Sequence, residues 1–470
     1  MKRTRLAVFL ACLVALTTTP RAQVGGAHSA PTTLTLEQAL QYALDHYPTV
    51  RAALEQVTAS TANVSVAKAA SLPRFDAVWQ TNQATANNVF GQLLPQSILP
   101  SISGPVLPSA SGQSVWGSAV GALFSWEPVD FGLRSAVVRE AEAGVARARA
   151  DEGLTRLAVQ NAVGSAFLSV VSAQQALAAA DADVRRREVL ARAAHTLADN
   201  QLRPGAEASR ADAELAAART RAIHTRAAVT LGQTTLSRLL GIPDGEVGVN
   251  TTRLLDNVAP GTQPVPAPQH PLLQSEQAAV DLARAREAVL TKTDRPRLYL
   301  QSSVFARGSG AHTDGVFDGG TGGLGLDRAN WAAGVQVVFP NLFDFSVLRS
   351  RRAAAGALTR AESARYDEAI LNVTSQQRAA DVMVDAARAV AQNTPVQLAA
   401  AQHSEAQARA RYDAGLAGIV EVAEAQNLLA GAEYQDAAAR VDVWRALLAK
   451  AVAQGNLASF IELLRTSGGQ

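Results

Sequence analysis

Asp130-Phe131-Gly132-Leu133-Arg134-Ser135-Ala136 begins a stretch, residues 130–241, that returns without a gap at residues 344–455. The offset is 214 residues, so Leu202 corresponds to Leu416 and Gly241 to Gly455. Upstream the offset is 223 residues, which pairs Pro48 and Pro73 with Pro271 and Pro296. A unit this long exceeds the roughly 20–50 residues of short solenoid repeats. We therefore predict two structurally equivalent halves.

The start of the chain has the pattern of a secretory signal. In Met1–Ala22 basic residues precede the apolar run Leu6–Leu16, and a small residue ends the segment. The whole chain has 43 basic and 41 acidic residues, so the mature form is close to neutral, which argues against nucleic-acid binding. Cys12 lies inside the signal, so we expect no disulfide and no cysteine-bound metal after cleavage, and acylation of Cys12 is the less favoured alternative.

No later segment has 18 or more consecutive apolar residues, so we expect no transmembrane helix. An exported chain of this kind is periplasmic, secreted or an outer-membrane β-barrel.

Two segments predict very long helices. Residues 131–200 contain no proline and carry an apolar seam, Val159–Val184, with steps of four and three residues. Such a helix is roughly 100 Å long. The turn Arg203-Pro204-Gly205 separates it from a second helix, and the pattern recurs around Tyr412–Gly418. Alanine-rich seams suit either a wall of closely packed helices or a filamentous coiled coil, and the helices alone leave both open.

A proline and a run of arginines lie inside these predicted helices. Pro395 falls within the second long helix, where it should kink or widen it. The arginines Arg185–Arg187 are expected on a solvated face.

Four segments have the two-residue period of strands instead. Residues 115–126 and 331–339 alternate large apolar with small or polar side chains, residues 298–306 do so less regularly, and 75–81 is the weakest. Alternation over about ten residues with aromatic ends fits strands with lipid on one side and water on the other. The residues predicted to face lipid are Trp116, Val120, Phe124, Trp126, Trp331, Val335, Val337 and Phe339.

Four strands cannot close a membrane barrel, which needs at least about eight strands. Open strand edges are not tolerated in hydrocarbon, so the chain must oligomerise if the strands enter a membrane. The alternative, an edge hairpin packed on a soluble core, is disfavoured because the sequence offers no further strands.

We therefore expect a signal peptide, two repeats joined by a linker, and a tail. The first repeat, 23–242, contains helix 36–72, β-hairpin 74–128, long helix 131–200 and helix 206–240. The second repeat, 271–455, contains helix 271–294, β-hairpin 297–340, long helix 345–412 and helix 419–454. The signal is 1–22, the linker 243–270 and the C-terminal tail 456–470.

The order and spacing of several motifs resemble the outer membrane efflux protein family, the TolC-like trimeric channels of tripartite efflux and type I secretion systems. The motifs are Leu34-Thr35-Leu36-Glu37-Gln38-Ala39-Leu40, Trp126-Glu127-Pro128-Val129-Asp130-Phe131-Gly132, Phe339-Pro340-Asn341-Leu342-Phe343-Asp344-Phe345 and Tyr412-Asp413-Ala414-Gly415-Leu416.

The resemblance implies a mainly α fold with membrane β structure: a long α-helical barrel and a transmembrane β-barrel that trimerisation completes with four strands per chain. It also implies a place in the outer membrane with extension into the periplasm. The implied partners are two further copies of the chain, a periplasmic adaptor (membrane fusion) protein, an inner-membrane pump and outer-membrane lipid. The implied function is passive conduction of substrates from the pump to the exterior.

The resemblance also implies a gate at the periplasmic tip. Tyr412 matches the family's gate tyrosine, Glu421 and Glu424 match its acidic positions, and Asp413 lies beside them. Ala417 stands where some members have a basic residue, and the candidates to substitute for it are Arg203, Arg409 and Arg411. The turns expected to contact the adaptor contain Leu202, Arg203, Pro204, Gly205, Gly415, Leu416 and Gly418. The alternatives are solvated glutamates and simple helix ends.

Catalytic and cofactor patterns are missing. The seven histidines show no metal-binding helical spacing, and Gly320-Thr321-Gly322-Gly323-Leu324-Gly325 matches a dinucleotide motif in the wrong context, because a strand follows it. We expect neither an enzyme nor a cofactor. The competing hypothesis is a secreted or periplasmic coiled-coil structural protein without channel activity. The sequence does not identify the cargo.

Overall fold

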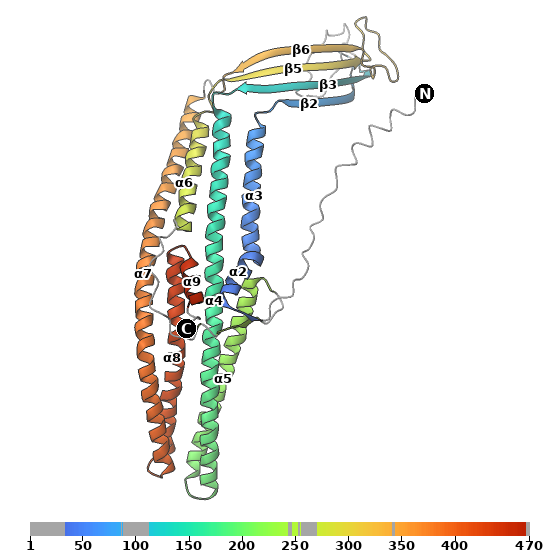
Figure 1. Cartoon of the computed structure of the whole chain (residues 1–470). Coiled ribbons are helices and arrows are strands. Elements are labelled where there is room, and N and C mark those ends of the chain that lie inside the picture. Colours follow the sequence, from blue (N-terminus) through green and yellow to red (C-terminus); the bar gives the residue numbers. More distant parts are fainter. Residues whose placement is uncertain are drawn as a thin grey trace.

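The computed structural model describes residues 33–85, 87, 112–242, 247–251, 254, 270–340 and 344–466. The predicted signal peptide and most of the predicted linker lie outside these residues. Within them the molecule is a long column of helices with a sheet at one end (Figure 1). The two repeats and the mainly α class with added β structure are as the sequence predicts.

Two helices span the whole column. Helix α4 (Leu133–Asp199) and helix α7 (Phe345–Asp413) have 67 and 69 residues and run from the sheet to the far turns (Figure 1). α7 continues through Pro395, so the proline does not end it. Shorter helices flank them: α3 (Pro48–Ala69) and α6 (Pro271–Leu290) beside the sheet, and α5 (Gly205–Leu240) and α8 (Ile419–Ala453) beside the turns.

Two predicted segments differ in the structure. The single helix expected over 36–72 is two helices, α2 (Leu36–His46) and α3, because Pro48 starts a new helix and leaves Tyr47 extended. The expected helix 271–294 ends earlier, at Leu290.

The predicted tail, 456–470, also differs, since it contains helix α9 (Ala458–Thr466). Phe460 of this helix lies edge-on to Trp444 with ring centroids 6.0 Å apart. The described part of the tail, up to residue 466, thus contributes to the core.

The main core lies at the middle of the column, where α2 and α9 pack beside the long helices. Trp444, Phe167 and Leu168 are fully buried there, and the Trp444 indole nitrogen donates to the Leu254 carbonyl oxygen over 2.8 Å. A short parallel pair, β1 (Thr33–Leu34) and β4 (Gly248–Val249), lies in the same region. Among the helices in the described part of the chain, α4 alone is long and apolar enough, by length and composition, to cross a membrane, and 39% of its most apolar stretch is buried.

The sheet has four antiparallel strands in the order β2-β3-β5-β6. The strands are β2 (Arg74–Thr85), β3 (Ser114–Val129), β5 (Arg297–Ser309) and β6 (Arg328–Val338). β3 is irregular near Pro128, where a proline cannot donate a ladder hydrogen bond. Consecutive repeats thus contribute one hairpin each, and the two hairpins join side by side.

Candidate functional site

One face of the sheet is apolar and open. Directly opposed residues of antiparallel strands lie on the same face, and the register pairs Trp79 with Val120 and Val304 with Trp331. The exposed fractions of Trp79, Trp331 and Phe75 are 78%, 78% and 75%. A water-soluble monomer rarely exposes so many large apolar side chains together.

The residues predicted to face lipid gather on this face. Val120, Val335, Val337 and Phe339 are exposed, while Trp116, Phe124 and Trp126 are half-buried. Phe124 packs against Phe75 of the neighbouring strand, with ring centroids 5.1 Å apart. The structure therefore brings together the side chains that the alternation selects, and their contact with lipid remains a prediction.

Trp126 lies at the helical end of the sheet. Its indole nitrogen donates to the Ser71 carbonyl oxygen, just beyond the end of α3, over 3.1 Å. An indole with an apolar ring and a satisfied N–H group suits the boundary between hydrocarbon and water.

The two turns at the opposite end of the column are equivalent in backbone. Gln201 and Gly415 both have positive φ, 61° and 75°. Pro204 and Gly418 are the extended residues before α5 and α8. Leu202 and Leu416, predicted to contact an adaptor, have exposed fractions of 70% and 73%. Each turn thus presents one apolar side chain to solvent at its tip.

Tyr412 is buried between the turns, with 4% of its surface exposed. The guanidinium carbon of Arg203 lies 5.2 Å from the centre of its ring, and Arg203 Nη2 donates to the Ala417 carbonyl oxygen over 3.3 Å. Arg203 also lies 3.7 Å from Glu207 Oε1. Burial raises the pKa of the Tyr412 hydroxyl, and the Glu207 carboxylate raises it further. The phenol is neutral at physiological pH.

The other predicted gate residues are more open. Glu421 is exposed and pairs with Arg411 over 3.3 Å, and Glu424 and Asp413 are exposed as well. Glu207, which the sequence analysis missed, occupies the repeat position equivalent to Glu421. Likewise Arg203 is equivalent to Ala417. Three arginines, Arg203, Arg409 and Arg411, were candidates for the basic residue that Ala417 replaces. Of these, Arg203 is the one that contacts Tyr412.

Further up the column, the expectation that Arg187 is solvated is wrong. Its exposed fraction is 1%, because α5 and α8 enclose it. Its guanidinium donates to Asp183 Oδ1 over 2.9 Å, to Glu214 Oε2 over 2.9 Å and to Asn427 Oδ1 over 2.7 Å. Arg221 donates to the second oxygen of Asp183 over 2.9 Å. This buried cluster links α4, α5 and α8.

Beside it, Arg186 bonds both carboxylate oxygens of Glu433, over 2.9 and 2.8 Å. This pair also joins α4 to α8. Paired Arg–carboxylate bonds of this kind fix geometry as well as charge.

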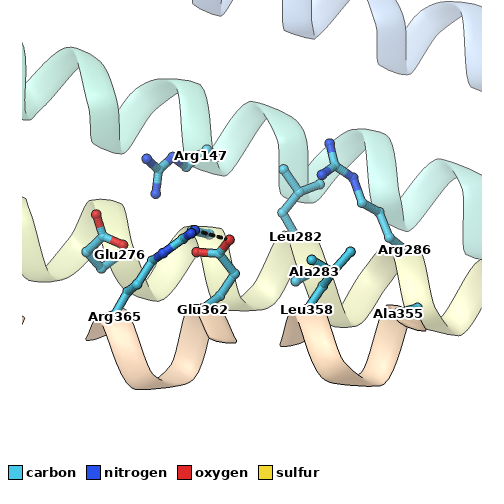
Figure 2. Close-up of a pocket in the computed structure, with 10 residues that line it drawn as sticks. Arg147, Glu276, Leu282, Ala283, Arg286, Ala355, Leu358, Glu362 and Arg365 are labelled. Atoms are coloured by element: carbon cyan, nitrogen blue, oxygen red, sulfur yellow. Dashed lines mark hydrogen bonds and ion pairs between the residues drawn. The ribbon is translucent and has the colours of Figure 1, made fainter. Parts of the chain in front are cut away.

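A groove of about 430 Å³ lies along α6 between α4 and α7 (Figure 2). Its arginines are engaged with carboxylates of the wall: Arg365 with Glu362 over 2.6 Å, Arg286 with Glu140 over 3.4 Å and Arg147 with Asp151 over 2.9 Å. The groove therefore offers paired charges rather than a built ligand site. No cluster of His, Cys, Asp or Glu suited to a metal occurs among the residues that the structure describes.

The chain matches the family model described as outer membrane efflux protein over residues 39–242 and 267–455, one segment per repeat. No curated protein sequence matches it significantly. Solved structures with the same fold include the outer-membrane channel OprN, at 17% identity, TM-score 0.69 and 90% coverage of both chains.

Two more share the fold at low identity. VceC of Vibrio cholerae is 16% identical with TM-score 0.68, covering 90% of this chain and 96% of that one. The Campylobacter jejuni CmeC outer membrane channel is 15% identical with TM-score 0.70, covering 92% and 89%.

Proposed function

The chain belongs to the outer membrane efflux protein family, and on this basis we propose that three copies form one passive duct from the periplasm to the exterior. As a member of this family it is an efflux channel of the outer membrane, extends into the periplasm and is not an enzyme. Conduction would be driven by partners, an inner-membrane pump linked through a periplasmic adaptor.

The unpaired edges and uncovered apolar face of the sheet are the observation that most directly supports a trimeric channel. Among the described strands, β2 and β6 each have a neighbour on one side only, and the apolar face has nothing packed on it. Unpaired backbone groups cost several kcal/mol each in hydrocarbon. Three copies give twelve strands, enough to close the edges around a lumen, whereas side chains fill a barrel of about eight strands.

The competing candidate is a coiled-coil structural protein that never enters a membrane. The long helices fit either function. A water-soluble structural protein, however, rarely exposes large apolar side chains such as Trp79 and Trp331 together on a sheet. Cell fractionation separates the two. Recovery of the mature chain in the soluble periplasm without detergent would overturn the channel.

We propose that Arg203, Tyr412 and Glu207 form the closed contact at the tip. A guanidinium over an aromatic ring contributes about 0.5–2 kcal/mol, and a hydrogen bond from a charged group about 1.5–3 kcal/mol. Each chain supplies one such contact, so three would have to break for the tip to open. Glu421, Glu424 and Asp413 would line the entrance, where threefold symmetry makes acidic rings that attract cations.

Single-channel recording in planar bilayers tests the gate. The variants Arg203→Gln and Tyr412→Ala should each raise the conductance of the reconstituted protein above that of the wild type. Arg284→Gln, which breaks an exposed pair with Asp281 on α6, is the control and should leave conductance unchanged. An unchanged conductance in the Arg203 and Tyr412 variants would remove this cluster from the gate.

We further propose that Leu202 and Leu416 are the adaptor anchors, together with Arg203, Pro204, Gly205, Gly415 and Gly418 of the same turns. Burying an exposed leucine side chain against a partner is favourable by about 1.5–3 kcal/mol. Cells that carry the Leu202→Glu and Leu416→Glu variant should lose export, while the purified variant should still conduct. Leu326→Glu, an exposed leucine in the loop before β6, is the matched control. Normal export in the double variant would refute the assignment.

A further inference from the structure

The two halves of the chain pack on each other through particular helices. Helix α4 of the first half packs against α6 and α8 of the second half, and strand β3 pairs with β5. By the repeat, the equivalents of α4, α6 and α8 are α7, α3 and α5. Among the described helices α7 packs against α6 and α8, and its far side has no comparable partner. The packing that joins the halves therefore has an unused counterpart on α7 and on the pair α3 and α5.

These surfaces lie at opposite edges of the molecule. Figure 1 shows α7 along one edge of the column, and α3 and α5 along the other. The sheet continues both edges, because β6 leads to α7, β2 follows α3, and these are the two end strands of the described sheet. Neighbouring strands are antiparallel throughout, so β6 of one copy and β2 of a second copy are antiparallel as well. The two edges can thus meet between copies, in the sheet and in the column together.

The edge of α7 exposes an apolar stripe. Leu371 and Val382 have exposed fractions of 71% and 68%. Exposed alanines extend the same helix face at spacings of three, four, seven or eight residues: Ala357, Ala361, Ala364 and Ala379. The buried residues Val373, Ala380 and Val384 lie on nearly the opposite side of the helix. A surface helix typically has one apolar face, and α7 has two, so the second face is available for a partner.

A contact inside the chain shows how the two edges align beside the sheet. Glu140 of α4 lies 3.4 Å from Arg286 of α6. The repeat places Ala354 of α7 and Asn63 of α3 at the equivalent positions. Helix α7 runs away from the sheet and α3 runs towards it, so each step along α7 from Ala354 corresponds to one step back along α3 from Asn63.

This alignment brings opposite charges together. Glu368 comes level with position 49 of α3, two residues from Arg51, and Arg360 comes level with position 57, two residues from Glu55. Two residues correspond to about 3 Å along a helix axis, which these long side chains can span. All four side chains are exposed, and none forms an ion pair with a residue in the described ranges. The edges are therefore complementary in charge.

A second contact aligns large apolar side chains lower in the column. Arg186 of α4 bonds Glu433 of α8 over 2.8 Å, and the equivalent positions are 400 in α7 and 219 in α5. Four residues back along α7 and four residues forward along α5, Val396 comes level with Ile223. The exposed fractions of Val396 and Ile223 are 67% and 64%, so contact between copies would remove both from water.

We infer that α7 of one copy packs on α3 and α5 of the next copy as α4 packs on α6 and α8 within a chain, with Arg51–Glu368 and Ile223–Val396 among the contacts. The inference rests on the proposed trimer and names the surfaces that meet in it. The partner is a second copy, because the charges and the apolar positions of the two edges match each other. A contact between two different surfaces leads from copy to copy in one direction, which is the arrangement that closes into a ring.

Cysteine cross-linking in membranes tests the alignment. Cys12 is the one cysteine of the chain and lies in the predicted signal, so introduced cysteines report on their own contacts. Ile223→Cys with Val396→Cys should form disulfide-linked dimers and trimers on mild oxidation, since disulfide-bonded residues have Cα atoms within about 7 Å. Leu231→Cys with Val396→Cys is the matched control, because eight residues move the partner about 12 Å along α5. That control and each single cysteine variant should remain unlinked.

Charge reversal tests the predicted ion pair. Arg51→Glu or Glu368→Arg should each lower the trimer fraction of detergent-purified protein at limiting concentration by up to about fivefold, the size expected for an exposed ion pair. The double reversal should restore the trimer, and failure to do so would remove this contact from the seam. Arg284→Glu, which disturbs an exposed pair on α6, is the control and should leave the trimer fraction unchanged.

The outcomes separate this inference from the proposed channel. Trimers in which the Ile223 and Val396 cysteines do not link, or in which Val396→Cys links to itself, would refute the seam and leave the channel standing. A wild-type chain that stays monomeric in the membrane extract would refute the seam and the trimeric channel together.

Discussion

Replacement of Arg187 by Met should destabilise the lower column strongly. Methionine keeps most of the volume but removes the three hydrogen bonds that the Arg187 guanidinium donates to Asp183, Glu214 and Asn427. Removing one partner of a buried ion pair costs about 3–5 kcal/mol, because the other charge stays buried. Asp183 is buried as deeply as Arg187, whereas Glu214 is about 29% exposed and can turn to water. Asp183 also keeps Arg221, so we expect the lower end, about 3 kcal/mol.

The matched control is Arg226→Met. Arg226 of α5 pairs with Asp181 of α4 over 3.6 Å, and these side chains are 65% and 36% exposed. Exposed pairs contribute about 0–1 kcal/mol. The measurement is denaturant unfolding of the detergent-solubilised protein at one fixed concentration, because the stability of an oligomer depends on concentration. Hydrogen exchange of the α4, α5 and α8 amides shows whether the loss is local.

A second variant distinguishes charge from packing. Replacing Arg187, Asp183 and Glu214 together by apolar residues removes the uncompensated charges and should recover most of the loss. The second repeat has Ala401, Gln397 and Leu428 at the equivalent positions, so the backbone accepts uncharged side chains there. If Arg187→Met lost no more stability than Arg226→Met, the account of the cluster as a structural tie would be refuted.

Three further predictions follow from single contacts. Val335→Arg on the apolar face should cost about 2–4 kcal/mol and reduce assembled protein in the membrane, whereas Gln336→Arg on the polar face should not, and equal yields would contradict the assignment of the faces. Trp126→Phe removes the bond to the Ser71 carbonyl oxygen and should cost about 1 kcal/mol in thermal unfolding. Burial lowers the pKa of His270, whose Nδ1 caps α6 by accepting from Leu272, so the folded state holds it neutral. Stability should therefore fall as pH drops below about 6.5, and His270→Asn, which keeps a cap, should flatten that dependence.

The sequence predicted the elements whose signals are local. Periods of 3.5 and two residues located the long helices and the strands, and prolines and glycines located most of the turns. Repeat equivalence also explains why Gly241 and Gly455 both end helices with positive φ, 76° and 75°. The prediction of one helix over 36–72 gave too little weight to Pro48, which forces the preceding Tyr47 to be extended.

Burial of Arg187 could not be predicted in the same way. Its partner Asn427 is 240 residues away, and the seam of α4 alone does not reveal that α8 covers it. For a similar reason the sequence did not identify which arginine contacts Tyr412 at the tip. Arg203, Arg409 and Arg411 are all near Tyr412 in the turns, and only the packing of the two turns brings Arg203 over the ring.

The two halves share a backbone but not its side chains, and this difference bears on how the tip would open. In a perfect duplication each turn would carry the same contact. Here Arg203 faces Ala417, its own repeat equivalent, and bonds its carbonyl oxygen. The contact therefore joins the hairpin of α4 and α5 to that of α7 and α8. Higher up, Arg186–Glu433 and Arg187–Asn427 join α4 to α8. In the proposed opening, a movement that separates the hairpins at the tip would break the partly exposed Arg203 contacts before it strained the buried ties. We therefore propose that these ties set a hinge above the proposed gate.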